Sequence, residues 1–190
     1  SFPTRRSSDL KCTQLMVDYQ EILYDKEAWL SPIRKSELFL YTTLVHVGNQ
    51  EYKTAKKYIS NAIIDHNIKY LPLMRTIRLV RLIVFYEVQE HELIQYESRS
   101  ITRSLSSPKE QTFKTERIIL WFLNKRNIPI LKKDREAFWE KLSPEIHELY
   151  NNKYESQLLR LFDFTAWMES KIRKEKLSEV LRARSSAKEC

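Results

Sequence analysis

Apolar residues recur at intervals of three and four positions along most of the chain, which is the spacing of an amphipathic helix. Capping signals separate these segments. Ser31-Pro32 places a hydroxyl before a proline at the first helical position, and Ser107-Pro108 is followed by Glu110, which can complete a capping box. Gly48-Asn49 and Asn151-Asn152 are stop signals. The pattern predicts helices near residues 12–25, 33–47, 51–66, 71–88, 90–105, 108–125, 132–149 and 153–173, with a short ninth helix at 174–184.

An internal repeat relates these helices with a period of 39 residues. Four apolar residues in one helix have apolar counterparts 39 residues later, and again after another 39, in the same i, i+1, i+4, i+5 spacing. These are Leu40, Tyr41, Leu44 and Val45, then Leu79, Val80, Ile83 and Val84, then Ile118, Ile119, Phe122 and Leu123. The helices between them keep this register once and lose it on the third pass, where Lys133 and Glu140 stand at apolar positions. The sequence therefore predicts stacked pairs of helices that share one core.

Gly48, Tyr52, Ala55, Ile59 and Ala62 resemble the turn and second helix of a tetratricopeptide repeat, where small residues let two helices approach closely. The residue match covers 37–66, and over 67–150 the resemblance rests on the period alone. The repeat is longer than the usual length of about 34 residues. In the second copy, bulky isoleucines replace both alanines. The resemblance implies an all-α fold whose antiparallel helix pairs stack as a right-handed α-solenoid over residues 11–173.

The segment Leu161–Ile172 resembles the closing helix of large bacterial repeat proteins of uncharacterised activity, in which it ends the chain. This resemblance implies a C-terminal fragment of such a protein and brings no activity with it. A terminal helix of a stacked array must cover the last exposed apolar face. We therefore expect the helix at 153–173 to act as a cap, with Trp167 in the core. Trp121 is expected to pack between helices, because it aligns with Leu82 in the repeat.

Composition supports the helical fold class and adds a basic net charge. A single glycine, six prolines and 31% charged residues argue against a β-rich fold. Ser1–Leu10 resembles one translated frame of a common sequencing adapter, so we exclude it from fold reasoning and expect the natural N-terminus to be missing. The net charge of +8 favours acidic or polyanionic partners. Two distant cysteines and the lack of a long apolar run predict a cytoplasmic chain without a transmembrane segment.

The catalytic motifs that this sequence suggests are incomplete. His91-Glu92 begins like a zinc-protease motif, but Gln95 occupies the position where the second histidine must stand on the same helix face. A phosphate-binding loop rich in glycine cannot be built from Gly48 alone. We therefore predict no metal, no cofactor and no catalytic residue, and we expect a protein that is not an enzyme.

A row of basic residues is the main candidate binding surface. Arg75, Arg78 and Arg81 lie on the helix predicted at 71–88, and the repeat aligns Lys114 with the first and Arg117 with the second. In tetratricopeptide proteins the first helix of each pair lines a concave groove. Cations there would bind an acidic peptide, with arginine giving bidentate contacts to carboxylates. The alternative is that the three arginines bury their stems between helices and pair with nearby glutamates.

The second basic feature is the C-terminal tail, residues 174–190, which continues the cationic run that starts at Lys171. It could contact nucleic-acid phosphates, which gives the alternative function of a helical-repeat arm in a transcriptional or other nucleic-acid-associated regulator. Alternatively, its apolar stripe could dock on the cap. The leading hypothesis is a protein–protein interaction scaffold that binds a partner peptide in a partly basic groove. A third hypothesis is a supporting domain of an enzyme whose catalytic part lies outside this chain.

Overall fold

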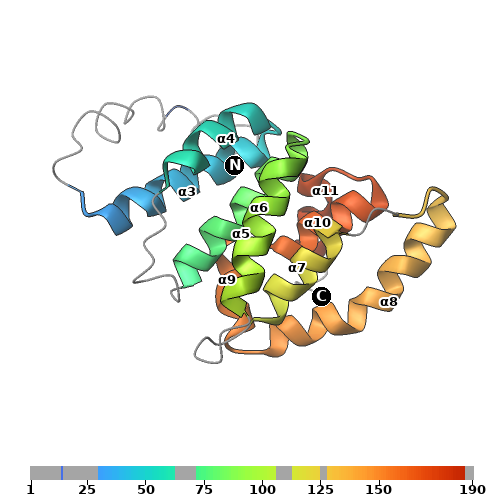
Figure 1. Cartoon of the computed structure of the whole chain (residues 1–190). Coiled ribbons are helices and arrows are strands. Elements are labelled where there is room, and N and C mark those ends of the chain that lie inside the picture. Colours follow the sequence, from blue (N-terminus) through green and yellow to red (C-terminus); the bar gives the residue numbers. More distant parts are fainter. Residues whose placement is uncertain (1–13, 15–29, 63–71, 106–112, 125–127, 187–190) are drawn as a thin grey trace.

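A computed structural model describes residues 14, 30–62, 72–105, 113–124 and 128–186, and these residues contain helices and no strands (Figure 1). The all-α fold class is thus confirmed. The helices are α3 (Pro32–Gly48), α4 (Tyr52–Asn61), α5 (Pro72–Glu87), α6 (His91–Leu105), α7 (Lys114–Asn124), α8 (Lys132–Asn151), α9 (Glu155–Leu161), α10 (Phe164–Arg173) and α11 (Leu177–Ser186). Apart from Gln14, the helix predicted at 12–25 lies outside the described residues.

One predicted helix is wrong, because the segment 153–173 forms two helices instead of one. The chain leaves the helix at Phe162, and the side chain of Asp163 accepts a hydrogen bond from the backbone N–H of Ala166 at 2.9 Å. That carboxylate therefore caps the start of α10 and satisfies a donor that would otherwise be free. An aspartate between two apolar runs is a capping signal. The sequence pattern did not reveal the break because apolar residues keep the helical spacing on both sides of Asp163.

The first two helix pairs end their first helix with the same turn. Gln50 and Gln89, which are 39 residues apart, both adopt a left-handed backbone conformation, with φ of 63° and 61°. In each turn the next residue, Glu51 or Glu90, donates its N–H to a carbonyl five positions back. This is the Schellman arrangement, which usually takes glycine at the left-handed position. The repeat seen in the sequence thus recurs as a repeated turn geometry in α3–α4 and α5–α6.

Helix α5 occupies the centre of the fold. It packs against α3, α4, α6, α7 and α9, and ten of its sixteen residues are buried. The third pair does not copy the first two, because α8 packs mainly on α9 and α10, in agreement with the loss of register in the sequence. Glu155 of α9 is buried and accepts hydrogen bonds from the backbone N–H groups of Lys114 and Thr115, so it caps the start of α7. The C-terminal helices thereby close onto α5 and α7.

Trp167 of α10 packs at the junction of this helix with α5 and α7. Its side chain is 1% exposed and meets the rings of Tyr86 and Phe122 edge to face, with centroids 5.4 and 5.6 Å away. The indole N–H donates to Glu87 at 2.8 Å. Its expected core position is thus confirmed. Trp121 differs, since it is 43% exposed and stacks on Phe138 of α8, which places it between two helices but at the surface.

Helix α11 docks on α10. Docking of the tail on the cap was one of the two alternatives that the sequence left open. Val180 is buried in the contact, and Arg184 forms ion pairs with Asp163 at 3.1 Å and Glu169 at 2.6 Å. The Arg184 guanidinium also donates to the hydroxyl of Tyr150. Burial alone would lower the pKa of Arg184, but Asp163, Tyr150 and Glu169 outweigh it and raise that pKa. Burial, followed by the Asp163 charge, raises the pKa of Tyr150 to about 12.

Replacing Trp167 by alanine should lower the free energy of unfolding by about 3–5 kcal/mol, because it leaves a cavity between three helices. Urea denaturation followed by circular dichroism measures this change. Trp121→Ala is the matched control, with an expected loss of about 1 kcal/mol since the ring is half exposed. Equal losses for the two variants would contradict the central position of Trp167.

Replacing Arg184 by alanine should loosen α11 while the rest of the fold stays intact. The loss leaves Asp163 without its guanidinium partner and Glu169 with Arg173 alone, at a cost of about 2 kcal/mol. Hydrogen exchange of the α11 amides should accelerate at least tenfold, with the amides of α5 unchanged. Unaltered exchange in α11 would show that Val180 and its apolar neighbours hold the helix without Arg184.

Candidate functional site: the groove between helices α6 and α7

The three arginines of α5 that the sequence singled out are engaged inside the fold. Arg75 forms an ion pair with Glu116 of α7 at 2.6 Å, and the two side chains are only 6% and 5% exposed. The Arg75 guanidinium also lies over the Phe113 ring, 4.8 Å from its centroid. Burial raises the pKa of Glu116, and the charge of Arg75 opposes this shift. This pair ties α5 to α7.

Arg78 and Arg81 connect α5 to its other neighbours. Arg78 bonds to Glu97 at 3.1 Å and to the hydroxyl of Ser100 at 3.0 Å, both on α6. Arg81 donates to the carbonyls of Ile59 and Ala62, at 3.1 and 3.0 Å, where α4 ends. Burial lowers the pKa of Arg81. The alternative of buried stems paired with glutamate therefore describes Arg75 and Arg78, whereas Arg81 uses backbone carbonyls.

Lys114 and Arg117 remain at the surface of α7. The ammonium group of Lys114 pairs with Glu148 of α8 at 3.1 Å, and both side chains are well exposed. Arg117 is exposed and lies seven residues, about two helical turns, before Asn124 on the same face of α7. The structure thus does not bring the five predicted cations to one surface. Three hold helices together and two face outward.

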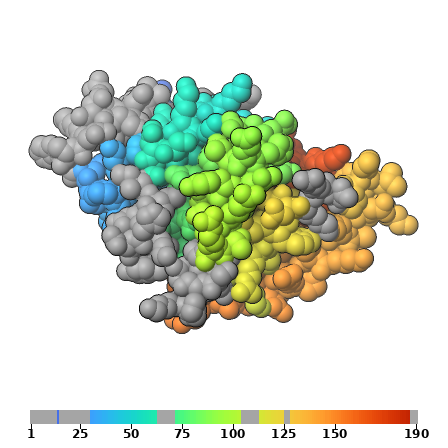
Figure 2. Space-filling model, viewed as in Figure 1, coloured from blue at the N-terminus to red at the C-terminus, as the bar shows by residue number. Residues whose placement is uncertain are grey.

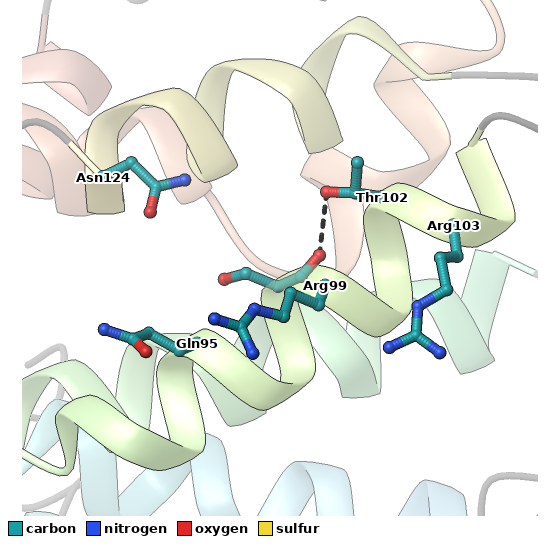
Figure 3. A pocket seen from close by; sticks show the side chains of 6 residues that line it. Gln95, Arg99, Thr102, Arg103 and Asn124 are labelled. Carbon is teal, nitrogen blue, oxygen red and sulfur yellow. Dashed lines mark hydrogen bonds between the residues drawn. The ribbon is translucent and has the colours of Figure 1, made fainter.

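A cavity of about 480 Å³ opens to solvent between α6 and α7. We refer to it as the α6–α7 groove. In Figure 3, Asn124 at the end of α7 lies across an open space from Gln95 and Arg99 of α6, and Arg103 follows one turn further along α6. The two helices lie side by side on one face of the molecule (Figure 2). The lining residues are Gln95, Ser98, Arg99, Thr102, Arg103 and Asn124.

The described lining of this groove carries positive charge and no acidic side chain. Arg99 and Arg103 are both exposed and stand four residues apart, so their side chains emerge from one face of α6. Among the described residues that line the groove, none is acidic. Like charges at this spacing disfavour a helix by about 0.2–0.5 kcal/mol. An anion between the two guanidinium groups would remove that repulsion and receive bidentate hydrogen bonds.

Ser98 gives the wall of the groove an unused hydrogen-bonding group. Its side chain is 7% exposed, and its hydroxyl oxygen has no hydrogen-bond partner within the described part of the chain. The hydroxyl of Thr102 is directed back to the Ser98 carbonyl at 2.8 Å, so it is committed to the helix. A buried hydroxyl without a partner loses hydration without compensation, so Ser98 is one of the uncommitted donors of this wall.

Sequence reasoning missed the groove because it favoured the three arginines of α5. The arginine pair on α6 carried a usable signal, since no acidic residue stands three or four positions from Arg99. That signal alone is weak, because Arg78 has no acidic neighbour at that spacing either and finds Glu97 across the helix pair. Burial separates the two cases. Arg78 lies on a helix that is apolar on nearly every face, and Arg99 lies on an amphipathic one.

His91-Glu92, the incomplete zinc-protease motif of the sequence, lies at the start of α6. The described ranges contain no group of three or more histidine, cysteine, aspartate or glutamate side chains placed to hold a metal ion. His91 and Glu92 are exposed at the start of α6. None of the helices in those ranges is long and apolar enough to cross a membrane.

Removing one partner of the Arg75–Glu116 pair should destabilise the fold far more than removing both. Arg75→Met leaves a buried carboxylate alone and should cost about 3–5 kcal/mol, whereas Arg75→Met combined with Glu116→Leu should lie within about 1 kcal/mol of the natural protein. Urea denaturation of the single and double variants measures this difference. Additive losses would show that the two side chains act independently.

No family model matches this chain, and no curated protein or solved structure is similar to it. Among the described residues, the groove presents two guanidinium groups with no acidic neighbour in the lining, two amides and one hydroxyl without a partner, at an open cleft between two helices.

Proposed function

We propose that the chain is a non-enzymatic protein–protein interaction module that holds an acidic segment of a partner protein in the α6–α7 groove. The observation that carries this proposal is the contrast between two sets of arginines. Arg75, Arg78 and Arg184 each contact a carboxylate within the fold, whereas Arg99 and Arg103 line an open cleft with no acidic side chain in its described lining. Cations with no acidic side chain beside them in the described lining are available to a partner.

The scaffold that presents this groove is proposed to be a tetratricopeptide-like stack. The α3–α4 and α5–α6 pairs share one turn geometry at the repeat distance, which supports their description as two copies of a unit. The third pair departs from that unit, and α9 and α10 close the end of the stack on α5 and α7. The α6–α7 groove lies between the α5–α6 pair, which follows the repeat, and the α7–α8 pair, which does not. We expect incomplete packing between two such pairs to leave space for a ligand.

The surroundings of the groove offer further charged and apolar contacts for a bound peptide. Arg117, on the same face of α7 as Asn124, extends the positive charge beyond the cavity. Tyr96 projects from α6 three residues before Arg99 and is 73% exposed, so it offers an apolar contact beside the arginines. Aromatic and arginine side chains together are typical of protein interfaces. We therefore expect contacts of both kinds with the partner segment.

The nucleic-acid alternative receives less support from the tail. Lys171 pairs with Glu87 at 2.6 Å, Arg173 pairs with Glu169 at 3.0 Å, and Arg184 is held by two carboxylates. Three of the cations that suggested phosphate binding are thus neutralised within the fold. The charge that remains on α11 is mixed, which favours the peptide hypothesis.

Reversing both groove charges should abolish binding to an acidic peptide. The probe is a fluorescein-labelled decaglutamate peptide, measured by fluorescence polarisation at constant salt. Arg99→Glu with Arg103→Glu should weaken binding at least about tenfold, since hydrogen bonds to charged groups contribute about 1.5–3 kcal/mol each.

The matched control uses Lys53→Glu with Lys57→Glu, an exposed basic pair of the same spacing on α4. This variant has the same change in net charge and should bind within about twofold of the natural protein, with long-range effects screened by salt. Equal weakening in the two double variants would show that net charge, rather than the groove, determines binding.

A further inference from the structure

We propose that the group bound between Arg99 and Arg103 is a phosphoryl group carried by a side chain of the partner protein, in preference to a carboxylate. This inference rests on the proposed function and specifies its ligand. It follows from three properties of the groove: its charge, its donors and the chemistry of its lining.

The charge of the groove matches a dianion. Arg99 and Arg103 place two positive charges about one helical turn apart, and no described lining residue offsets either of them. A glutamate or aspartate side chain brings one negative charge and neutralises one arginine. A phosphorylated side chain carries a charge of about −1.5 to −2 at pH 7 and can neutralise both.

The donors of the groove also exceed what a carboxylate can accept. Each guanidinium presents a planar fork of N–H groups, and two forks together fill the roughly four acceptor sites of a carboxylate and leave the other donors of the groove without an acceptor. A phosphoryl group has three terminal oxygens in a tetrahedral arrangement, so it accepts from several directions. Gln95 and Asn124 supply amide donors from opposite helices (Figure 3), and Ser98 supplies a hydroxyl that has no partner among the described residues.

The chemistry of the lining gives the proposal a distinctive pH dependence. Among the described lining residues the only charged groups are the two arginines. The second pKa of a phosphoryl group is about 6. Binding of a phosphopeptide should therefore weaken as the pH falls from 7.5 to 5, because the ligand loses one negative charge. Binding of a glutamate peptide should stay nearly constant over that range.

The first experiment detects the site directly. Inorganic phosphate is added to ¹⁵N-labelled protein, and the side-chain Nε–H signals of the arginines are followed by NMR at constant ionic strength. The signals of Arg99 and Arg103 should shift and saturate together, while that of the exposed Arg182 on α11 should not move. Uniform small shifts at all exposed arginines would indicate screening and would overturn the site.

The second experiment identifies the ligand. Three peptides of one neutral sequence carry phosphoserine, glutamate or serine at the central position. The phosphoserine peptide should bind at least tenfold more tightly than the other two at pH 7.5, and this preference should shrink several-fold at pH 5. Arg99→Lys with Arg103→Lys keeps the charge but loses the bidentate contacts, so it should weaken phosphopeptide binding. Lys53→Gln with Lys57→Gln should not.

The outcomes separate this inference from the proposed function. Equal binding of the phosphoserine and glutamate peptides, both dependent on Arg99 and Arg103, would overturn the phosphoryl assignment and leave the acidic-peptide function intact. Failure of both peptides to engage the two arginines would overturn both proposals. Tighter binding of a single-stranded DNA oligonucleotide than of the phosphopeptide, through the same residues, would replace the partner protein by a nucleic acid.

Discussion

The position of α5 at the centre of the fold is the constraint on which the rest of the structure depends. A helix buried against five others can carry charge only where acceptors meet it inside the protein. Its three arginines therefore determine which helices pack beside α5. Arg75 holds α7 through Glu116, Arg78 holds α6 through Glu97, and Arg81 holds the end of α4 through two carbonyls. Apolar packing drives the association, and these contacts specify which helix lies where.

The described arginines can be divided in the same way, into those whose charge is paired inside the fold and those whose charge is open to a ligand. An arginine whose donors are satisfied inside the protein gains nothing from a ligand, and disturbing it costs stability. Arg184 shows this at the other end of the molecule, where it joins α11 to two carboxylates and a tyrosine hydroxyl. The pair on α6 has no such role among the described residues. The described lining of the groove is open, positive and rich in donors, and we propose that anionic partners bind there without cost to the fold.

Much of the architecture could be predicted from the sequence. The spacing of apolar residues located the helices, and the structure adds that the turns at Gln50 and Gln89, which are one 39-residue period apart, share a left-handed conformation. The break at Asp163 was missed because apolar spacing continues across it, although an aspartate between two apolar runs is a capping signal. The tetratricopeptide-like stack remains a proposal, because the closure of α9 onto α5 depends on contacts far apart in sequence.

The candidate site was harder to predict, and the reason is physical. The α5 segment is apolar on nearly every face, which indicates burial of its arginines as well, yet their acceptors lie 41 and 19 residues away at Glu116 and Glu97. Contacts over such separations are set by packing and leave no local signal. The arginine pair on α6 can be recognised as a candidate site only when the partners of the α5 arginines are known.

The separation of structural from available arginines is tested most directly by comparing Arg78→Gln with Arg99→Gln in one series. Each variant is assayed for the free energy of unfolding and for binding of the decaglutamate peptide. Arg78→Gln should lose about 2 kcal/mol of stability and keep its affinity, because Glu97 and Ser100 lose their partner while the groove is unchanged. Arg99→Gln should stay within about 0.5 kcal/mol of the natural stability and bind several-fold more weakly. A stable Arg78 variant that loses binding, or an Arg99 variant that unfolds easily and binds normally, would contradict this account.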